Sequence, residues 1–242
     1  MNNKIKATVW NEYGEIQKKP EVANVYPNGI HTVIADFLNK DPDIQAKTAV
    51  LDDADHGLSE SVLNETDVLL WWGHAYHDKV EDRIVKNVID HVQRGMGVIF
   101  LHSAHKSKPF MQLLGTSGSL SWREAEEKTR VWTSAPEHPI AAGIPEQFVL
   151  EHEEMYGEPF GIPEPLKTVF ISWFQGGNVF RSGVTFTREY GRIFYFQPGH
   201  ETNPSYHNEY VQRIITNAVK WAKPVIKVDA LSCQKAEALE AL

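Results

Sequence analysis

Short apolar runs alternate with amphipathic stretches along most of this chain, and this alternation constrains its fold more than any other feature. Residues 67–72 (DVLLWW) form an almost unbroken apolar run, which is typical of a strand buried on both faces. Residues 30–38 and 81–93 instead repeat apolar side chains at helical spacing. Strands that alternate with helices predict an α/β protein with an open, mostly parallel sheet and helices on both faces.

The remaining elements follow from the same two periods. We predict strands at residues 4–10, 46–51, 67–72, 98–102, 148–156, 168–174, 183–187 and 192–196, and helices at residues 30–38, 59–65, 81–93 and 209–221. The stretch 120–134 is predicted to end in a strand. Turn sequences such as GGN and EYG separate the later strands, which indicates a late antiparallel portion of the sheet. We expect one domain over residues 1–224 and a tail over 225–242, whose end, AEALEAL, favours a solvated helix.

The composition argues against several classes of protein. The 242 residues carry a net charge of −8 without a basic cluster, so a nucleic-acid partner is not expected. No run approaches the roughly 18 apolar residues of a membrane span, and we expect a cytoplasmic protein without a membrane partner. The single cysteine, Cys233, lies in the tail, which excludes disulfides, thiolate-rich zinc sites and a buried cysteine nucleophile. Histidines and carboxylates remain as candidate ligands and acid–base groups.

Four predicted strands end in polar residues that could form a site. Ligands of open parallel sheets bind beyond the carboxyl ends of the strands, so these segments are expected to meet at one edge. The residues concerned are Asn11 and Glu12 after the first strand, His74 and His77 after the third, His102 and His105 after the fourth, and His200 and Glu201 after the last. Five of the 11 histidines therefore gather at one edge of the predicted sheet.

A structural role explains some of these histidines better than others. His74 and His77 suit a site and a polar loop equally well. His102 directly follows a buried strand, where the chain opens into a cleft, and a glycine before His200 lets the backbone approach a ligand closely. Both are therefore expected to be functional. His105 is expected to point away from the site.

Residues 151–156 (EHEEMY) add a candidate pair of ligands. Alternate residues of a strand share a face, so His152 and Glu154 are expected on the same face. With His102 and His200 they would place neutral imidazoles and a carboxylate around an open water position, a set that suits zinc or another divalent ion. The sequence has no HExxH or CxxC spacing, so this metal site depends on the predicted fold.

Aromatic and polar side chains near the strand ends are compatible with a carbohydrate ligand but are not specific to one. Aromatic faces can stack on sugar rings, and Trp72 and Trp122 belong to a group of aromatic residues of which several lie at strand ends. The hydrogen-bonding residues expected for such a ligand are Asn11, Arg181, His74 and His77. Core packing is the competing explanation for the tryptophans.

Several longer segments resemble one known family. They are LHSAHKSKPFMQLLGTSGSLSWRE, EEMYGEPFGIP, FISWFQGGNVFRSGVTF and FYFQPGHETNPSYH. These segments resemble the ThuA (trehalose utilisation) family, and the resemblance spans most of residues 4–223. It implies a flavodoxin-like domain similar to the class I glutamine amidotransferases, and a role in the metabolism of a disaccharide or keto-sugar.

The amidotransferase comparison fails at the residues that carry the chemistry. In that superfamily a cysteine stands at a tight elbow after the strand that matches residues 98–101, and a His-Pro-x-Glu motif follows the strand that matches residues 193–196. Here His102 stands near the elbow, and residues 197–201 read Gln-Pro-Gly-His-Glu. Acyl transfer from glutamine is excluded because no thiolate can form. Ser103, with His200 as its base, is a minor alternative nucleophile.

Two functions from different classes remain. The first is a metal-dependent isomerase, lyase or hydrolase, in which zinc held by the histidine and carboxylate set above polarises a carbonyl or hydroxyl of a sugar. Glu201 or Glu12 would then move the proton. The second is a non-catalytic sugar-binding or regulatory protein. The oligomeric state is open, although the apolar segment 173–174 could close a homo-oligomer interface.

Overall fold

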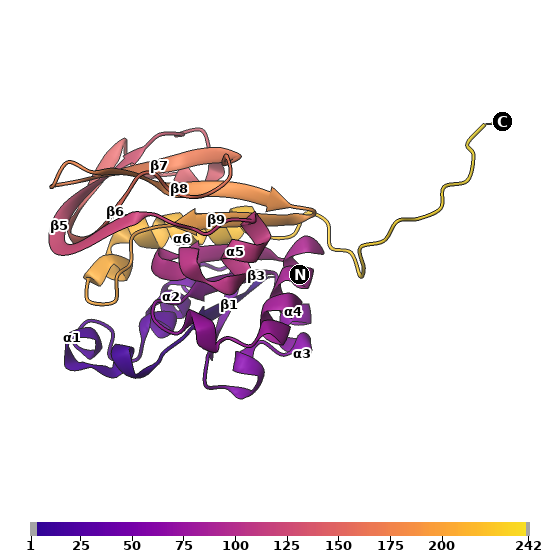
Figure 1. Ribbon diagram of the computed structural model, residues 1–242, viewed down its shortest axis with the longest axis horizontal. Coiled ribbons are helices and arrows are strands. Elements are labelled where there is room, and N and C mark those ends of the chain that lie inside the picture. The colour runs from indigo at the N-terminus through magenta and orange to yellow at the C-terminus, as the bar shows by residue number, and fades with distance from the viewer. Residues whose placement is uncertain (1–3, 241–242) are drawn as a thin grey trace.

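The structure, a computed structural model, describes residues 4–240 of the 242 in the chain. Within them the strands form a nine-stranded sheet in the order β2-β1-β3-β4-β9-β8-β7-β5-β6 (Figure 1). The strands are β1 (Ile5–Asn11), β2 (Ile44–Val50), β3 (Val68–Trp72), β4 (Gly97–Leu101), β5 (Ser121–Thr133), β6 (Gln147–Gly157), β7 (Lys167–Phe174), β8 (Val179–Arg188) and β9 (Gly191–Phe196). The α-helices are α1 (Pro20–Ala23), α2 (Ile30–Leu38), α3 (Glu60–Glu65), α4 (Asp82–Gln93), α5 (Lys108–Leu114) and α6 (Glu209–Ala222).

The sheet has a parallel half and an antiparallel half. The pairings of β1 with β2, β1 with β3, β3 with β4, and β4 with β9 are parallel. The pairings that lead from β9 through β8, β7 and β5 to β6 are antiparallel. The predicted late antiparallel portion is confirmed, but the sheet is evenly mixed rather than mostly parallel. The difference lies in the pairing directions, which the local sequence does not contain. In addition, β5 is a full strand of 13 residues, whereas only its end was predicted.

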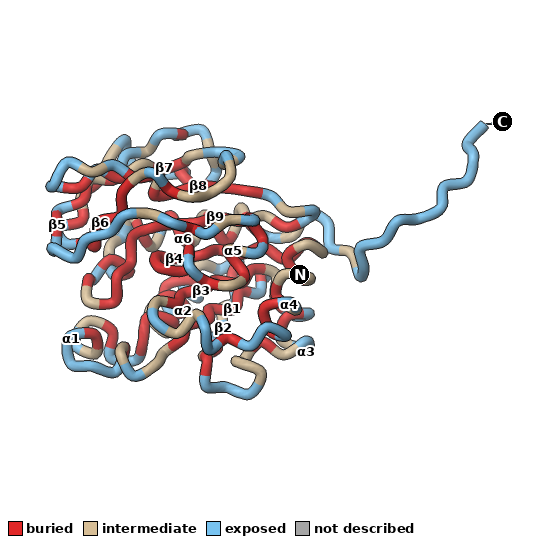
Figure 2. The backbone as a smooth tube through the Cα atoms, in the orientation of Figure 1, coloured by how far each residue is buried: buried red, intermediate tan, exposed pale blue. Residues whose placement is uncertain are grey.

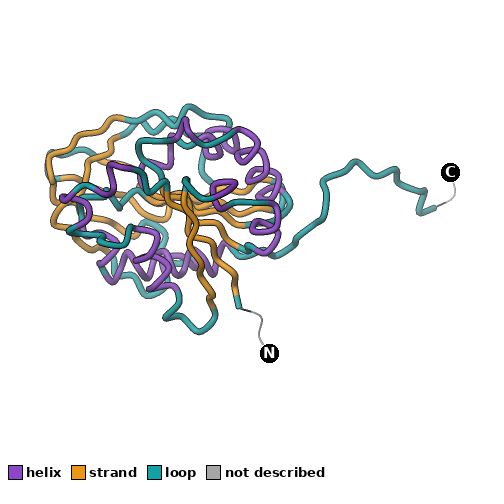
Figure 3. Tube along the Cα trace, turned by 90° about the horizontal axis from the view of Figure 1, so that it is seen from below, coloured by secondary structure: helices purple, strands orange, loops and turns teal. Residues whose placement is uncertain are grey.

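Helices cover both faces of the parallel half, as predicted. On one face α2 and α6 contribute Ile34 and Ile215 to a core cluster. On the other face α4 and α5 contribute Val88 and Phe110 to a second cluster. The central strands β3 and β4 are fully buried (Figure 2), with helices to either side (Figure 3), whereas the edge strand β2 is mostly exposed or half-buried. This double cover explains the apolar run of β3, whose five residues are all buried.

Local signals set several helix ends where the sequence predicts them. Ser59 Oγ accepts a hydrogen bond from Val62 N at the start of α3, as an N-cap serine does. Asn208 caps α6 in the same way, by accepting hydrogen bonds from two backbone N–H groups of its first turn. That helix ends at Ala222, shortly before Pro224, which has no N–H to continue it. No helix within residues 4–240 is long and apolar enough to cross a membrane.

The tail and the predicted oligomer segment both differ from expectation. Residues 236–240 form no helix and extend away from the sheet (Figure 1), so the predicted helix is wrong for them, whereas residues 241–242 lie outside the described residues. So short a helix is unstable in water without a surface to pack on. Phe174 is fully buried and cannot contribute to an interface, which leaves Trp173, 37% exposed, as the accessible part of that segment.

Candidate active site

Four loops meet at the carboxyl ends of the parallel strands. They follow β1, β3, β4 and β9, and the last three carry histidines. The loop after β3 contains His74, the loop after β4 contains His102, and the loop after β9 contains His200 and Glu201. Glu154 on the antiparallel strand β6 joins them. The structure thus brings five of the residues singled out from the sequence into one cluster.

His102 occupies an elbow directly after β4. Its φ of 52° lies in the left-handed region that side-chain-bearing residues rarely adopt, and its ring is fully buried. His102 Nδ1 lies 2.9 Å from the carbonyl oxygen of Gln197, which can only accept a hydrogen bond, so Nδ1 carries a proton. His102 Nε2 faces Glu154 Oε2 at 3.0 Å. Nε2 is therefore the atom left to bind a second proton or a metal ion.

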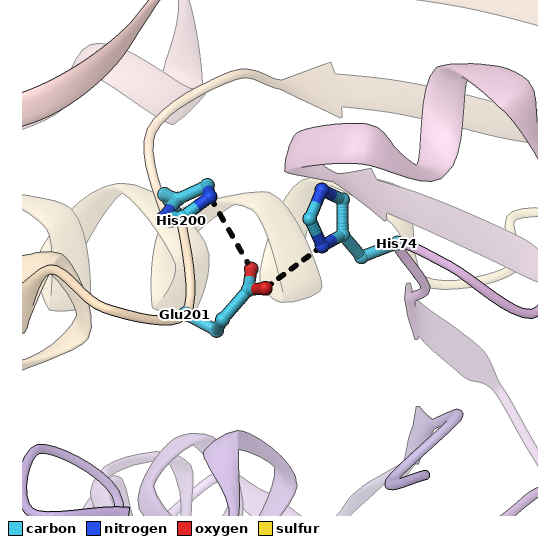
Figure 4. A group of neighbouring side chains, drawn as sticks. All are labelled: His74, His200 and Glu201. Carbon is cyan, nitrogen blue, oxygen red and sulfur yellow. Dashed lines mark hydrogen bonds and ion pairs between the residues drawn. The ribbon is translucent and has the colours of Figure 1, made fainter. Parts of the chain in front are cut away.

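Glu201 lies between two imidazoles (Figure 4). His74 Nδ1 is 2.8 Å from Glu201 Oε1, and His200 Nε2 is 3.6 Å from Glu201 Oε2. On its far side, His200 Nδ1 lies 2.8 Å from the Thr202 hydroxyl. That contact orients the ring, so that Nε2 of His200 faces the carboxylates of the cluster.

Three buried polar atoms in the cluster have no hydrogen-bond partner among the described residues. They are Glu154 Oε2, which has only its ion-pair contact with His102, together with His200 Nε2 and Glu201 Oε2. Unpartnered buried polar atoms are rare in folded proteins, and a role in binding an ion explains them. Two overlapping sets, His102 with Glu154 and His200, and His74 with His200 and Glu201, each place their ligand atoms within 4.8 Å of one another. Both sets could hold a metal ion.

The two ion pairs of the cluster shift pKa values away from their ordinary range. Burial by itself lowers the pKa of His102, but the interaction with Glu154 outweighs it and raises that pKa to about 9. Burial also lowers the pKa of His74, and the interaction with Glu201 outweighs it, so that this pKa is raised. Burial raises the pKa of Glu201, but its interaction with His74 lowers it to about 2. In the metal-free protein His102 is therefore protonated at neutral pH.

The Glu12 carboxylate holds the loop that carries His74. Glu12 is buried, and it accepts hydrogen bonds from the backbone N–H groups of His74, Ala75 and Tyr76 at 2.8, 2.9 and 3.0 Å. Both of its oxygens are occupied. Glu12, predicted as a candidate base, is therefore a positioning residue in this structure.

We expect Glu12→Ala to release the loop at residues 74–76. The substitution leaves three N–H groups of this partly exposed segment without their acceptor, so that water replaces the carboxylate. Amide hydrogen exchange of residues 74–76 should accelerate strongly, whereas Glu15→Ala, which removes an exposed carboxylate in the same segment, should not change it. Unchanged exchange in Glu12→Ala would show that other contacts hold the loop.

Glu153 holds the loop that carries His200. Its carboxylate is fully buried and accepts hydrogen bonds from Gly199 N at 2.9 Å, His200 N at 3.1 Å and the Ser205 hydroxyl at 2.6 Å. Sequence reasoning did not single out Glu153. The sequence did contain a signal for it, because the predicted strand EHEEMY carries three glutamates. Glutamate is depleted in strands, so three in one strand indicate a specific role.

The predicted placement of His152 and Glu154 on one strand face is wrong. The register of β6 against β5 shifts by one residue between Leu150 and Glu153, which marks a β-bulge. The bulge breaks the alternation, so Glu153 and Glu154 are both buried while His152 is exposed. His152 Nδ1 instead lies 3.3 Å from the carbonyl oxygen of Glu126. His152 thus lies outside both candidate metal sets.

Comparison with known proteins identifies the family of this chain. The family model for ThuA, described as trehalose utilisation, matches residues 6–222. The chain belongs to the ThuA family. No curated protein matches it.

Solved structures share the ThuA-family fold of this chain. A putative ThuA-like protein from Parabacteroides merdae is 15% identical over 93% of each chain, with a TM-score of 0.67. A second putative ThuA-like protein, from Bacteroides uniformis, is 15% identical over 90% of this chain and 91% of that one, with a TM-score of 0.64. A cytoplasmic protein from Salmonella typhimurium is 15% identical over 90% of this chain and 99% of that one, with a TM-score of 0.60. At these identities the likeness shows a shared fold.

The elbow of this ThuA-family chain carries no serine–histidine pair. Ser103 Oγ lies 2.8 Å from the Tyr156 hydroxyl, and that hydroxyl lies 3.4 Å from His102 Nε2. Among the described residues no hydrogen bond joins Ser103 to His200, its predicted base. An activated serine needs its base within direct hydrogen-bond reach, so this geometry disfavours Ser103 as a nucleophile.

A cavity of about 380 Å³ opens beside the cluster. Its lining includes His74, His77, Ser103, His105, Glu154 and Tyr156. His105 was expected to point away, and that expectation is wrong, because the turn after β4 directs its ring to the cavity wall. Burial lowers the pKa of His77 to about 4 and that of His105 to about 3, so both rings are neutral at pH 7.

Three residues predicted to bind a sugar are engaged elsewhere. Asn11 is fully buried, and its side-chain amide lies 3.1 Å from His31 Nδ1. Trp72 is fully buried, and its Nε1 donates to a backbone carbonyl of the loop after β9. Arg181 binds both carboxylate oxygens of Glu158. In this structure each of them joins strands and loops, and their role in sugar binding stays a prediction.

Proposed function

We propose that this chain binds a divalent metal ion, zinc, through His102 Nε2, Glu154 Oε2 and His200 Nε2, and uses it to act on a sugar. The observation that carries the proposal is the convergence of buried atoms without hydrogen-bond partners, two of which belong to this set. Two imidazoles and one carboxylate form a ligand set of catalytic zinc sites, which keep a further position open for water or substrate. The contact of the Gln197 carbonyl with Nδ1 of His102 supports it, because such partners orient histidine ligands.

The pair formed by His74 and Glu201 supplies the proton transfer in this proposal. Zinc would stabilise the negative charge that develops on oxygen when a keto-sugar enolises or is hydrated. A general acid or base works best when its pKa lies near the working pH. The pKa of Glu201, about 2, is too low for this task, whereas the His74 imidazole lines the cavity and is held by Glu201 at 2.8 Å. We therefore assign proton transfer to His74, and we assign to Glu201 the orientation of that ring.

The comparisons and the strand order support a substrate class, a flavodoxin-like topology and a cellular location for this chain. ThuA is described as trehalose utilisation, which supports a disaccharide or keto-sugar as the substrate. The order β2-β1-β3-β4-β9 of the parallel half corresponds to the flavodoxin order 2-1-3-4-5, which supports a flavodoxin-like ancestry of that half. A cytoplasmic location is supported by the similar protein from Salmonella typhimurium, which is described as cytoplasmic.

Metal content tests the proposal directly. Wild type, purified without chelators and reloaded with zinc, is expected to hold near-stoichiometric zinc by elemental analysis. His102→Ala and His200→Ala should lose it, because each removes a ligand. His152→Ala is the matched control and should keep it, since His152 is exposed outside the metal sets.

Two results would contradict the metal proposal. Wild type that holds no zinc after reloading would favour the non-catalytic sugar-binding or regulatory function instead. Zinc loss in His152→Ala equal to that in His102→Ala would place the ion elsewhere.

A further inference from the structure

We propose that the cavity beside the metal site is a subsite for one ring of an uncharged sugar, with Trp122 as the stacking platform at its mouth and His77 and His105 as its hydrogen-bonding wall. This inference rests on the proposed function, because it places the bound ring beside the metal ion. It names the substrate as a neutral polyhydroxylated ring rather than a phosphorylated one.

Trp122 presents an aromatic face at the cavity. Its side chain lines the cavity, yet Trp122 is 63% exposed, more than the other exposed tryptophans of the described chain. Across the sheet it pairs with Tyr156 of β6, which lines the same cavity from a buried position. A large exposed aromatic residue at the rim of a pocket offers the face on which an apolar side of a sugar ring stacks. Trp132, on the same strand and 40% exposed, does not line the cavity.

The wall of the cavity offers hydrogen-bonding groups without charge. His77 Nε2 is buried and has no hydrogen-bond partner among the described residues. His105 Nδ1 lies 2.7 Å from the carbonyl oxygen of Gly118, so Nδ1 carries the proton and Nε2 remains an acceptor. Burial keeps both rings neutral at pH 7. Neutral donors and acceptors match the hydroxyl groups of a sugar.

The charged groups around the cavity give an anionic substrate little to bind. Its lining includes the carboxylates of Glu124 and Glu154, and Lys106 is the one lysine found there. The Lys106 ammonium already donates to the carbonyl oxygen of Ser117. No arginine is among the residues found to line the cavity, so a phosphate group would lack the bidentate partner that usually binds it.

The size of the cavity fits a single ring. Its volume of about 380 Å³ lies near the lower end of the roughly 300–1,000 Å³ typical of small-molecule sites. A disaccharide would therefore place one ring in the cavity and the other over the exposed start of β5.

Calorimetric titration of the zinc-loaded full-length protein tests the subsite with three probes, glucose, trehalose and glucose 6-phosphate. We expect glucose or trehalose to bind, and glucose 6-phosphate to bind more weakly than glucose. Trp122→Ala should weaken sugar binding about tenfold, which corresponds to the loss of about 1.4 kcal/mol of stacking. Trp132→Ala is the matched control and should bind like wild type.

Three outcomes would overturn the subsite. They are the absence of binding by both neutral sugars, equal affinities of Trp122→Ala and wild type, and tighter binding of glucose 6-phosphate than of glucose. Zinc content measured on the same samples separates this inference from the metal proposal. Sugar binding that depends on Trp122 in a protein without zinc would contradict the zinc site and leave the subsite standing. A zinc-loaded protein that binds neither neutral sugar would contradict the subsite and leave the zinc site standing.

Discussion

The zinc affinity of the protein is expected to rise about tenfold per pH unit, or about 100-fold in all, between pH 6 and pH 8, and to level off above pH 9. The reason lies in the buried ion pair of the elbow. Glu154 raises the pKa of His102 to about 9, so the metal-free site holds a proton on Nε2 that zinc must displace. Each unit of pH below that pKa makes the displacement tenfold harder.

Competition with a chelator of calibrated affinity measures this dependence. His152→Ala should reproduce the wild-type slope. Glu154→Gln removes the carboxylate that raises the pKa of His102, and we expect this variant to bind zinc more weakly than wild type. Its zinc affinity should also rise less steeply above about pH 6.5, the ordinary histidine pKa. An affinity of wild type that does not change between pH 6 and pH 8 would rule out His102 as the ligand.

The metal-free protein gives a second readout of the same ionisation, with the opposite sign. The pKa of His102 is higher in the folded chain, about 9, than its ordinary value of 6.5. The stability that the pair contributes is therefore fully present below pH 6.5 and is lost as the pH rises through 9. The thermal midpoint of the metal-free protein should fall over this interval, and the fall should be smaller in Glu154→Gln.

Glu153→Ala is expected to lower the free energy of unfolding by about 3–5 kcal/mol, since the buried partners of the carboxylate would lose their acceptor together. Gly199 N, His200 N and the Ser205 hydroxyl all depend on this one side chain. Because the same loop presents His200, zinc affinity should fall as well.

Urea unfolding of the metal-free variants measures the effect without a contribution from bound zinc. Glu153→Gln keeps one carbonyl oxygen and should cost less than Glu153→Ala. Glu151→Ala removes an exposed carboxylate from the same strand and should be nearly neutral. Equal stability of Glu153→Ala and Glu151→Ala would show that the loop after β9 does not depend on Glu153.

Local patterns in the sequence predicted most elements of the parallel half. The apolar run of β3 and the helical stripe of α4 each needed only the period of neighbouring residues, and the structure has both. The edge at which His74, His102 and His200 gather also followed, because the carboxyl ends of parallel strands lie together. Local patterns did not predict the roles of individual side chains.

The bulge in β6 shows why. Two-residue periodicity predicts one face for His152 and Glu154, and an extra residue in one strand breaks that alternation. A bulge is set by the partner strand, whose register does not appear in the local sequence.

Patterns along the chain were enough to predict the family, the alternation of strands and helices, and the edge of the sheet that carries the histidines, because each depends on residues close together in the sequence. The folded arrangement was needed to show that Glu12 and Glu153 hold loops, that Trp72 and Asn11 are buried in the core, and that His105 lines a cavity. Those roles depend on contacts between residues far apart in the sequence, since the burial and hydrogen bonding of a carboxylate or an imidazole are set by the other segments that surround it.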